Sequence, residues 1–333
     1  MDAKIKHVVL TGGVGSRLWP LSRKSNPKQY IKLFKNESLF EKTIKRNLSI
    51  TDDLIVVGNI NNYHLSKEVT NELNLDPVNI IEATPRNTAA AIAFSAFSAD
   101  EEDILVVTPS DHIIQGENEY LEALNKAVEL ALEGSIVTFG INPTKPETGY
   151  GYIEFDNDNV ISFREKPNKE TAEEFIESGK FLWNSGMFCF KAGVFLEELK
   201  KYEPEVYKSS EKVWLENDAG KLELESSLKI PSISVDYAVM ERSSKIKVVA
   251  SKFKWSDLGS FESVYDYLLD TGHDVDKEGN MIIGAEKYTA FVGLKNTIFI
   301  STDDANLILQ KEDAQDVKKV YKALDKVNSR LLD

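Results

Sequence analysis

Residues 11–30 read TGGVGSRLWPLSRKSNPKQY and directly follow the apolar run HVVL at positions 7–10. The turn after this run contains three closely spaced glycines, Gly12, Gly13 and Gly15. Because glycine has no Cβ, such a turn brings backbone N–H groups close to anionic oxygens. Arg17 and Lys28 add two full positive charges to the same stretch. An apolar strand, a glycine turn and two cations predict a loop that binds phosphate groups, and they favour nucleotide chemistry.

Two well-known phosphate loops do not match this segment. A dinucleotide-binding fingerprint needs a further glycine at the position of Leu18, and a Walker A loop needs Gly-Lys-Ser/Thr, which the loop lacks. The missing glycine weakens the alternative of a nicotinamide-dependent oxidoreductase. The segment therefore predicts a third kind of phosphate loop.

Chain length and charge limit the possible architectures and partners. The 333 residues exceed the size at which one core usually keeps growing, so we expect one large and one small domain. The 40 Lys and Arg residues against 54 Asp and Glu residues give a formal charge of -14, which disfavours nucleic acid and anionic membranes as partners. No stretch approaches the ~20 apolar residues of a membrane helix. We therefore expect a soluble protein. The single Cys189 cannot form an intrachain disulfide, which fits the reducing cytoplasm.

Apolar runs and helical patterns alternate in the first half of the chain and predict an α/β fold. Five apolar runs are typical of buried strands, at residues 8–10, 54–57, 78–81, 104–107 and 136–139. Helical patterns separate them, at residues 40–48, 62–71, 88–99 and 120–132. This alternation implies a parallel sheet covered on both faces, with ligands bound beyond the carboxyl ends of its strands. The glycine turn and Asp111 both follow predicted strand ends, so we expect them in one crevice.

The pattern becomes mixed after Gly149. β-rich pieces at 150–155, 160–164, 186–190 and 245–250 surround a helical insertion at about 194–216. The polar segment 270–280 is our preferred linker, and β-like runs at 281–283, 290–292, 297–301 and 306–309 precede a final helix from Val317 to Leu331. We expect a catalytic domain at 1–270, divided into halves at about 1–148 and 149–270, and a small β-rich domain at 271–333.

Further motifs carry a resemblance to a known family. They are ThrProSerAspHis at 108–112, GlyTyrGlyTyrIle at 149–153, PheArgGluLysPro at 163–167, TrpAsnSerGlyMetPhe at 183–188 and TrpSerAspLeuGly at 255–259. With the glycine segment, they resemble the nucleotide-sugar pyrophosphorylases, specifically the mannose-1-phosphate guanylyltransferases, over residues 5–265. The resemblance implies a Rossmann-like nucleotide-diphospho-sugar transferase fold with a mixed central sheet, a small C-terminal β-helix-like domain and a homodimer. It also implies that GTP and mannose 1-phosphate are converted to GDP-mannose and pyrophosphate.

Such a reaction depends on positioning more than on acid–base chemistry. The second pKa of a phosphate monoester is about 6, so the attacking sugar phosphate is largely a dianion at neutral pH and needs no general base. The site has to align the reactants and neutralise clustered negative charge. This requirement explains motifs rich in glycine, lysine, arginine and aspartate that contain no convincing nucleophile.

The glycine loop is our candidate for holding the triphosphate. Four residues present backbone N–H groups to the β- and γ-phosphates, namely Gly12, Gly13, Gly15 and Ser16. Arg17 stabilises the leaving pyrophosphate and Lys28 reaches the α- or β-phosphate; a plain surface lysine is the alternative for Lys28. Mg²⁺ suits this chemistry because it binds few carboxylates together with phosphate oxygens and water. The resemblance places Asp111 and Asp257 on opposite sides of that ion, although each alone could be a turn or cap residue.

Two further segments are candidates for binding the base and the sugar phosphate. Guanine presents N1–H and N2–H₂ donors on one edge, so the carboxylate of Glu82 is a suitable reader. Asn87 and Thr88 follow in the same segment, where Asn87 is equally well explained as a helix N-cap.

For the sugar, the resemblance implies that Glu165 binds hydroxyl groups and that Lys166 binds the 1-phosphate. Asn184 is a further hydroxyl ligand, and Gly149 leaves room for backbone contacts to the hexose. Asp236 is interpreted as an N-cap, with contact to the substrate as the alternative. We take Arg17, Lys28, Asp111 and Lys166 as the catalytic set. Two alternatives stay open: the same reaction on glucose or manno-heptose 1-phosphate, and a non-catalytic regulatory homologue that binds nucleotide sugars.

Overall fold

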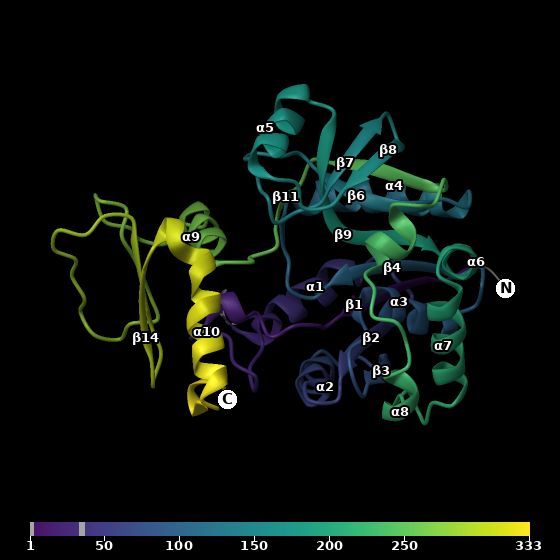
Figure 1. The fold of residues 1–333 in the computed structure, drawn as a ribbon, viewed down its shortest axis with the longest axis horizontal. Coiled ribbons are helices and arrows are strands. Elements are labelled where there is room, and N and C mark those ends of the chain that lie inside the picture. Colours follow the sequence, from purple (N-terminus) through teal and green to yellow (C-terminus); the bar gives the residue numbers. More distant parts are fainter. Residues whose placement is uncertain (1–2, 33–36) are drawn as a thin grey trace. The chain divides into compact units, whose positions relative to one another are not determined.

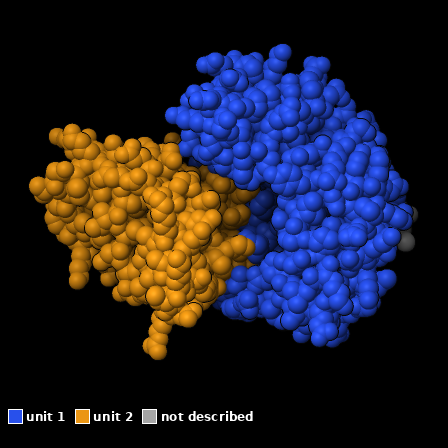
Figure 2. Space-filling view, in the orientation of Figure 1, with its two compact units in different colours: residues 1–12, 42–110, 114–255 blue, residues 13–41, 111–113, 256–333 orange. Residues whose placement is uncertain are grey.

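The computed structural model describes residues 3–32 and 37–333, and Figure 1 shows its helices and strands. The chain folds into two compact units, which Figure 2 colours separately. Unit 1 comprises residues 1–12, 42–110 and 114–255, and unit 2 comprises residues 13–41, 111–113 and 256–333. Most of the glycine loop and the segment around Asp111 therefore belong to the unit that holds the C-terminal part of the chain. The predicted linker at 270–280 lies inside unit 2, whose last segment begins at residue 256.

Unit 1 is built on a mixed central sheet. Among the described residues, nine strands follow the order β3-β2-β1-β4-β9-β6-β10-β8-β7. Their bounds are Ile5–Leu10 (β1), Asp53–Asn59 (β2), Val78–Glu82 (β3), Ile104–Pro109 (β4), Ile136–Ile141 (β6), Tyr152–Asp156 (β7), Asn159–Arg164 (β8), Phe181–Lys191 (β9) and Ile246–Ser251 (β10). β1 pairs parallel with β2 and β4, whereas β9 is antiparallel to β4 and β6. The strands predicted in the first half of the chain are all present.

The central sheet is buried on both faces by two apolar clusters. Successive residues of a strand point to opposite faces, so each central strand contributes to both clusters. Along β4, Leu105 packs into one apolar cluster, and the next residue, Val106, packs into another. Helix α3 (Asn87–Phe97) contributes to the first cluster and is apolar nearly all round. Helix α4 (Glu117–Leu132) contributes to the second cluster, where Cys189 of β9 is also fully buried. Burial raises the pKa of the Cys189 thiol, so this residue acts as a small hydrophobe.

The helices predicted between the first strands are confirmed as α1 to α4. The other helices and short strands are α1 (Leu39–Asn47), α2 (Tyr63–Glu72), α5 (Lys169–Ser178), α6 (Ala192–Tyr202), α7 (Pro204–Leu215), α8 (Leu224–Ser227), α9 (Phe261–Asp270), β5 (Ile113–Gln115) and β11 (Lys254–Ser256). The predicted insertion at 194–216 corresponds to α6 and α7. Within the described ranges, no helix combines the length and the apolar character that crossing a lipid bilayer requires.

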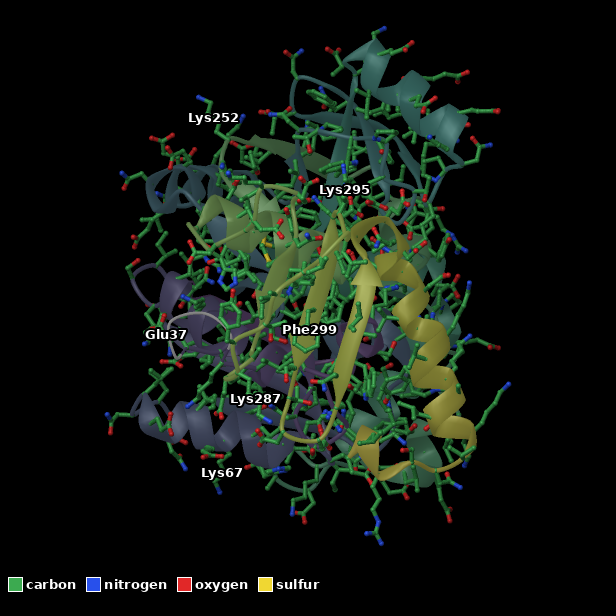
Figure 3. The ribbon with its side chains drawn as sticks, turned by 90° about the vertical axis from the view of Figure 1, so that its left-hand side faces the viewer. Glu37, Lys67, Lys252, Lys287, Lys295 and Phe299 are labelled. Carbon is green, nitrogen blue, oxygen red and sulfur yellow. The ribbon has the colours of Figure 1, made fainter. Side chains whose placement is uncertain are left out.

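Unit 2 packs the glycine loop and the C-terminal residues around one core. Its buried apolar side chains include Leu18 and Trp19 from the loop, together with Phe261, Ile298 and Leu332. Its three-stranded sheet, within the described residues, consists of β12 (Met281–Ile283), β13 (Thr297–Ser301) and β14 (Asn306–Gln310). β13 is the central strand, on which Figure 3 labels Phe299. Residues from the two ends of the sequence therefore share one core.

Two predictions for this end of the chain are wrong. Residues 290–292 form no strand in the described structure, and Val292 is 90% exposed there. A short apolar run without a neighbouring strand or a face to bury gains nothing from β structure. The final helix, α10 (Val317–Lys326), ends before Leu331 because Asn328 adopts a positive φ of 49° and the hydroxyl of Ser329 accepts from the N–H of Leu331.

A polar network lies inside unit 1 and joins β1 to β4. His7 of β1 is 1% exposed, and its Nε2 lies 2.8 Å from Thr108 Oγ1 and 3.2 Å from Asn47 Nδ2. The hydroxyl of Tyr120 donates to Asn47 Oδ1 at 2.8 Å. Burial, with the positive charge of Arg46 nearby, lowers the pKa of His7 to about 3. The folded protein therefore keeps this imidazole neutral at all mildly acidic pH values.

We predict that His7 makes the protein sensitive to mild acid. The unfolded chain binds a proton on His7 below pH 6.5 while the folded chain does not, so stability falls as the pH decreases. The loss of unfolding free energy that His7 causes reaches about 1.4 kcal/mol per pH unit below pH 6.5. Thermal melts of wild type and His7→Gln between pH 7 and pH 5 should show a weaker pH dependence for the variant. The exposed His64 offers a matched control, and equal slopes for wild type and His7→Gln would contradict the prediction.

Candidate functional site

The glycine turn after β1 has a backbone conformation that requires glycine at two positions. Gly13 and Gly15 adopt φ values of 89° and 77°, a left-handed conformation that other residues rarely take. A Cβ on Gly15 would lie 2.5 Å from Lys28 Cβ, so only glycine lets the lysine pack against the turn. The N–H of Lys28 also donates to the carbonyl of Val14 at 3.2 Å. The turn and Lys28 thus form one local structure.

Lys28 joins the two predicted metal-binding aspartates. Its ammonium Nζ lies 2.8 Å from Asp111 Oδ2 and also donates to the backbone carbonyl of Asp257. The Lys28 side chain is 6% exposed, which excludes the alternative of a solvated surface lysine. The structure therefore brings three residues together, although Asp111 and Asp257 lie 83 and 229 positions from Lys28 in the sequence.

The carboxylate of Asp111 is held in its ionised form. Its partial burial alone raises the pKa, but Lys28 and His112 outweigh burial and bring the pKa of Asp111 below its ordinary value. The nearest imidazole nitrogen, His112 Nε2, is 3.7 Å from Asp111 Oδ1. Asp257 Oδ1 accepts from the N–H of Gly259 at 3.0 Å, which orients this second carboxylate.

The donor set fits Mg²⁺ only together with a substrate. Over residues 3–32 and 37–333, no group of three or more His, Cys, Asp or Glu side chains could hold a metal ion. Mg²⁺, however, is commonly bound by one or two carboxylates plus phosphate oxygens and water. Asp111 and Asp257 provide that number of carboxylates. Arg17 and the neighbouring Gly12 and Gly13 are exposed, so their donors are accessible to an anion.

The predicted base-binding segment lies in unit 1 at the end of β3. Glu82 is 8% exposed, and its Oε1 has no hydrogen-bond partner in the described part of the chain. Burial raises the pKa of Glu82 to about 7, although the N–H of Arg86 acts in the opposite direction. Arg86 itself anchors the segment, because its Nε donates to the carbonyl of Ile230 at 2.6 Å.

Asn87 is not the N-cap of α3, so the N-cap interpretation of this residue is wrong. Asn87 is the first residue of α3, with a positive φ of 69°, and the N-cap position falls on Arg86. Asn87 Oδ1 accepts from the N–H of Thr88 at 2.8 Å. The Thr88 hydroxyl accepts from the N–H of Val235 at 2.9 Å, so it connects the helix start to the segment before Asp236.

The predicted sugar-binding residues meet in another part of unit 1. Lys166 adopts a positive φ of 47° and pairs with its neighbour Glu165. The Glu165 side chain is 13% exposed and that of Lys166 62%. A Cβ on Gly151 would lie 2.6 Å from Glu165 Oε2, which shows how closely the glycine motif approaches this carboxylate. Gly149 is exposed, and its N–H donates to Glu147 Oε1 at 3.0 Å.

Asn184 links this group to Asp236. Its Nδ2 donates to Asp236 Oδ1 at 2.9 Å, while its Oδ1 accepts from Thr138 Oγ1 at 3.2 Å and from the N–H of Gly186 at 3.1 Å. Burial and the charge of Glu165 raise the pKa of Asp236. The N-cap interpretation of Asp236 is therefore wrong: it is the first residue of a short π-helix, Asp236–Met240, and its carboxylate bonds to Asn184. No spacing pattern in the sequence signalled this pair.

Comparisons with known proteins agree with these motifs. The nucleotidyl transferase family model matches residues 6–273, and the MannoseP isomerase/GMP-like beta-helix domain model matches residues 274–324. Mannose-1-phosphate guanylyltransferase 2 of Escherichia coli O157:H7 is 38% identical, over 97% of this chain and 74% of its own length. The second family model confirms the predicted β-helix-like end of the chain.

Solved structures give the same fold. A mannose-1-phosphate geranyltransferase from Thermus thermophilus is 28% identical, with a TM-score of 0.84 over 97% of this chain and 99% of that one. A mannose-6-phosphate isomerase from Helicobacter pylori is 41% identical, with a TM-score of 0.69 over 76% of this chain and 99% of that one. The predicted nucleotide-diphospho-sugar transferase fold is confirmed.

We predict that Asp236→Asn stabilises the protein at neutral and alkaline pH. A carboxyl group whose folded pKa is raised destabilises the folded state once the pH rises above its unfolded pKa, and an amide does not. Asparagine can still accept from Asn184. The melting temperature of Asp236→Asn should exceed that of wild type at pH 8, and the difference should shrink as the pH falls toward 4. The more exposed Asp158 serves as a control for the same exchange, and a lower melting temperature at pH 8 would refute the prediction.

Proposed function

We propose that this chain, which belongs to the nucleotidyl transferase family, makes GDP-mannose and pyrophosphate from GTP and mannose 1-phosphate. It is similar over nearly its whole length to mannose-1-phosphate guanylyltransferases. One observation supports this reaction most directly. The buried ammonium of Lys28 lies beside the glycine turn and contacts both the carboxylate of Asp111 and the backbone of Asp257. This is a charged structure suited to a triphosphate.

In the proposed reaction, a phosphate oxygen of mannose 1-phosphate attacks the α-phosphorus of GTP in line with the leaving group. The new oxygen–phosphorus bond forms as the bond between the α-phosphorus and the bridging oxygen breaks, and pyrophosphate leaves. The nucleophile is already ionised, so no residue has to remove a proton. The protein contributes alignment and charge neutralisation.

The glycine segment is proposed to hold the triphosphate. Gly12 precedes unit 2 in the chain, and Gly13, Gly15 and Ser16 within it offer backbone N–H groups to the β- and γ-phosphates. Arg17 is exposed and would pair with the departing pyrophosphate. An ammonium group has three donors, of which Lys28 uses two for Asp111 and Asp257 among the described residues, so the third would be offered to a phosphate oxygen.

Mg²⁺ is part of this proposal. Asp111 and Asp257 would hold the ion together with phosphate oxygens and water. When bound, it would neutralise negative charge on the phosphates. The ionised state of Asp111, maintained by Lys28, keeps that carboxylate available at neutral pH.

Separate residues are proposed for the base and the sugar. The free Oε1 of the buried Glu82 is suited to accept the N1–H or N2–H₂ of guanine, which would satisfy a polar atom that otherwise has no partner among the described residues. Asn87 and Thr88 begin the adjacent helix. Glu165, Asn184 and Asp236 offer acceptors to hexose hydroxyls, and the exposed ammonium of Lys166 is accessible to a 1-phosphate.

The finer features of the family resemblance belong to the same proposal. We expect a cytoplasmic homodimer that prefers GTP. Glucose 1-phosphate and manno-heptose 1-phosphate are the competing substrates, and tight binding of GDP-mannose without turnover would indicate a regulatory homologue instead. The name of the Helicobacter pylori relative makes isomerisation of mannose 6-phosphate an activity to test in parallel.

We predict that the purified protein releases pyrophosphate only when GTP, mannose 1-phosphate and Mg²⁺ are all present. Asp111→Asn should lower kcat by about 10²-fold or more, because it removes both a metal ligand and the partner of Lys28. The control is Asp158→Asn, which makes the same exchange in the exposed ion pair between Lys126 and Asp158. A coupled phosphate assay with a panel of sugar phosphates measures both rate and specificity. Full activity of Asp111→Asn, or none in wild type, would remove the basis of the proposal.

We also predict that the KM for GTP falls as the pH rises from 6 to 8. Guanine needs the ionised form of Glu82, and for a group with a pKa of about 7 the ionised fraction rises about tenfold over this range. Glu82→Gln should abolish this slope and weaken the preference for GTP over UTP. The control is Glu198→Gln, since Glu198 is a second buried glutamate with an unpartnered oxygen in the described part of the chain. An unchanged slope and unchanged base preference in Glu82→Gln would exclude Glu82 as the base reader.

A further inference from the structure

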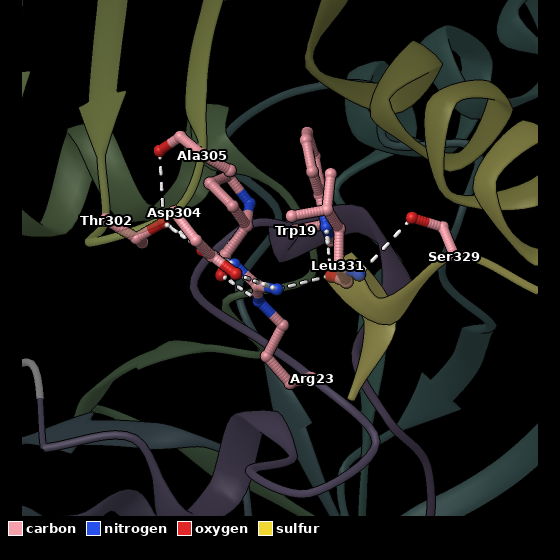
Figure 4. A network of polar contacts seen from close by, with 8 residues as sticks. Trp19, Arg23, Thr302, Asp304, Ala305, Ser329 and Leu331 are labelled. Carbon is pink, nitrogen blue, oxygen red and sulfur yellow. Dashed lines mark hydrogen bonds and ion pairs between the residues drawn. The ribbon is translucent and has the colours of Figure 1, made fainter.

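The segment after the glycine turn is bonded to the last residues of the chain, as Figure 4 shows. Trp19 Nε1 donates to the carbonyl of Leu331 at 2.9 Å, and the N–H of Lys24 donates to the carbonyl of Leu332 at 2.7 Å. Leu332 is 1% exposed in the core that also contains Leu18. All these residues belong to unit 2.

Arg23 is the centre of this contact. Its Nη2 and Nη1 donate to the two carboxylate oxygens of Asp304 at 2.5 Å and 3.2 Å, which is the bidentate geometry of a strong charge-assisted pair. Nη1 also donates to the carbonyl of Leu331, Nη2 to Thr302 Oγ1 at 3.5 Å and Nε to the carbonyl of Pro20 at 2.8 Å. Asp304 and Thr302 lie in the turn between β13 and β14.

These contacts occupy the whole hydrogen-bonding capacity of the guanidinium group. Arginine has five N–H donors, and each has an acceptor here. The Arg23 side chain is also only 11% exposed. Although Arg23 belongs to the signature segment, it has no donor left for a phosphate. Its role must therefore act through the residues that it holds.

A short path connects Arg23 to the glycine turn. The preceding residue, Ser22, is fully buried, and its hydroxyl donates to the carbonyl of Gly15 at 2.6 Å. The N–H of Leu18 donates to the same carbonyl at 2.8 Å. Gly15 in turn packs directly against Lys28. A displacement of residues 22 and 23 would therefore move the turn and the lysine.

We propose that Arg23 is a positioning residue, through which Asp304 and Leu331 at the C-terminal end of the chain set the geometry of the triphosphate loop. This inference rests on the proposed function, because it takes the glycine turn to be the site of GTP binding. In this arrangement, residues of the small C-terminal domain at 271–333 support nucleotide binding without touching the nucleotide.

The test separates positioning from a general loss of folded protein. Fewer folded molecules lower kcat and leave KM unchanged, whereas a displaced loop raises the KM for GTP. Arg23→Lys keeps the charge but cannot form the bidentate pair, and we expect it to raise the KM for GTP about tenfold. Asp304→Asn should give a smaller rise, and because the Asp304 side chain is 52% exposed, it remains usable if Arg23→Lys folds poorly. The KM for mannose 1-phosphate should stay constant in both.

Lys24→Ala is the matched control. Lys24 lies next to Arg23 and pairs with Asp325 of α10 at 2.9 Å, but both side chains are about half exposed, at 50% and 55%. Exposed pairs contribute little, so the kinetics should not change. An unchanged KM for GTP in both Arg23→Lys and Asp304→Asn, or an equal rise in Lys24→Ala, would overturn the proposal.

Hydrogen exchange of the backbone amides in residues 13–28 gives a readout that does not depend on turnover. Exchange in this segment should be faster in Arg23→Lys than in Lys24→Ala. If wild type neither binds GTP nor releases pyrophosphate, the proposed function fails, while the exchange data still show whether Arg23 holds the loop. Equal exchange rates in the two variants would refute the positioning role by themselves.

Discussion

The ammonium group of Lys28 imposes the central constraint on the part of this protein around the glycine turn. A buried positive charge has to be paired and hydrogen-bonded, because its transfer from water is costly. Lys28 meets this requirement with the carboxylate of Asp111 and the backbone carbonyl of Asp257. The loop after β1, the loop after β4 and the segment before α9 therefore have to converge, and the glycine at position 15 allows the lysine to approach the turn.

Opposite electrostatic solutions are used in the two units. The whole chain has a formal charge of -14, but in unit 2 cations lie near the glycine turn and Lys28 keeps Asp111 ionised. In unit 1, burial raises the pKa values of Glu82 and Asp236, so these carboxyl groups favour the neutral form more than exposed ones do. Groups that receive hydroxyl or N–H donors from a ligand tolerate such burial, because the ligand replaces the hydrogen bonds that water would provide.

The first half of the fold could be predicted from the sequence because its strands are short, continuous apolar runs and its helices carry periodic apolar positions. The segment at 290–292 was misjudged because an apolar run forms a strand only where a neighbour and a buried face exist, and Val292 has neither. Asp236 was misjudged because its partner, Asn184, is 52 positions away in the sequence. The compact units also depart from sequence order, since the core of unit 2 contains Leu18 together with Leu332.

The sequence by itself determined the α/β class and the family of this protein, because these depend on residue types at short, fixed spacings. Tertiary structure alone decided which charges pair, which carboxylates are buried and how the signature segment is supported. Arg23 illustrates the difference. In the sequence it is one more cation beside the glycine turn, whereas in the fold its five donors are occupied by acceptors that lie mainly near the end of the chain, at positions 302, 304 and 331 of 333. Pairings across such separations depend on chain packing, which local patterns do not encode.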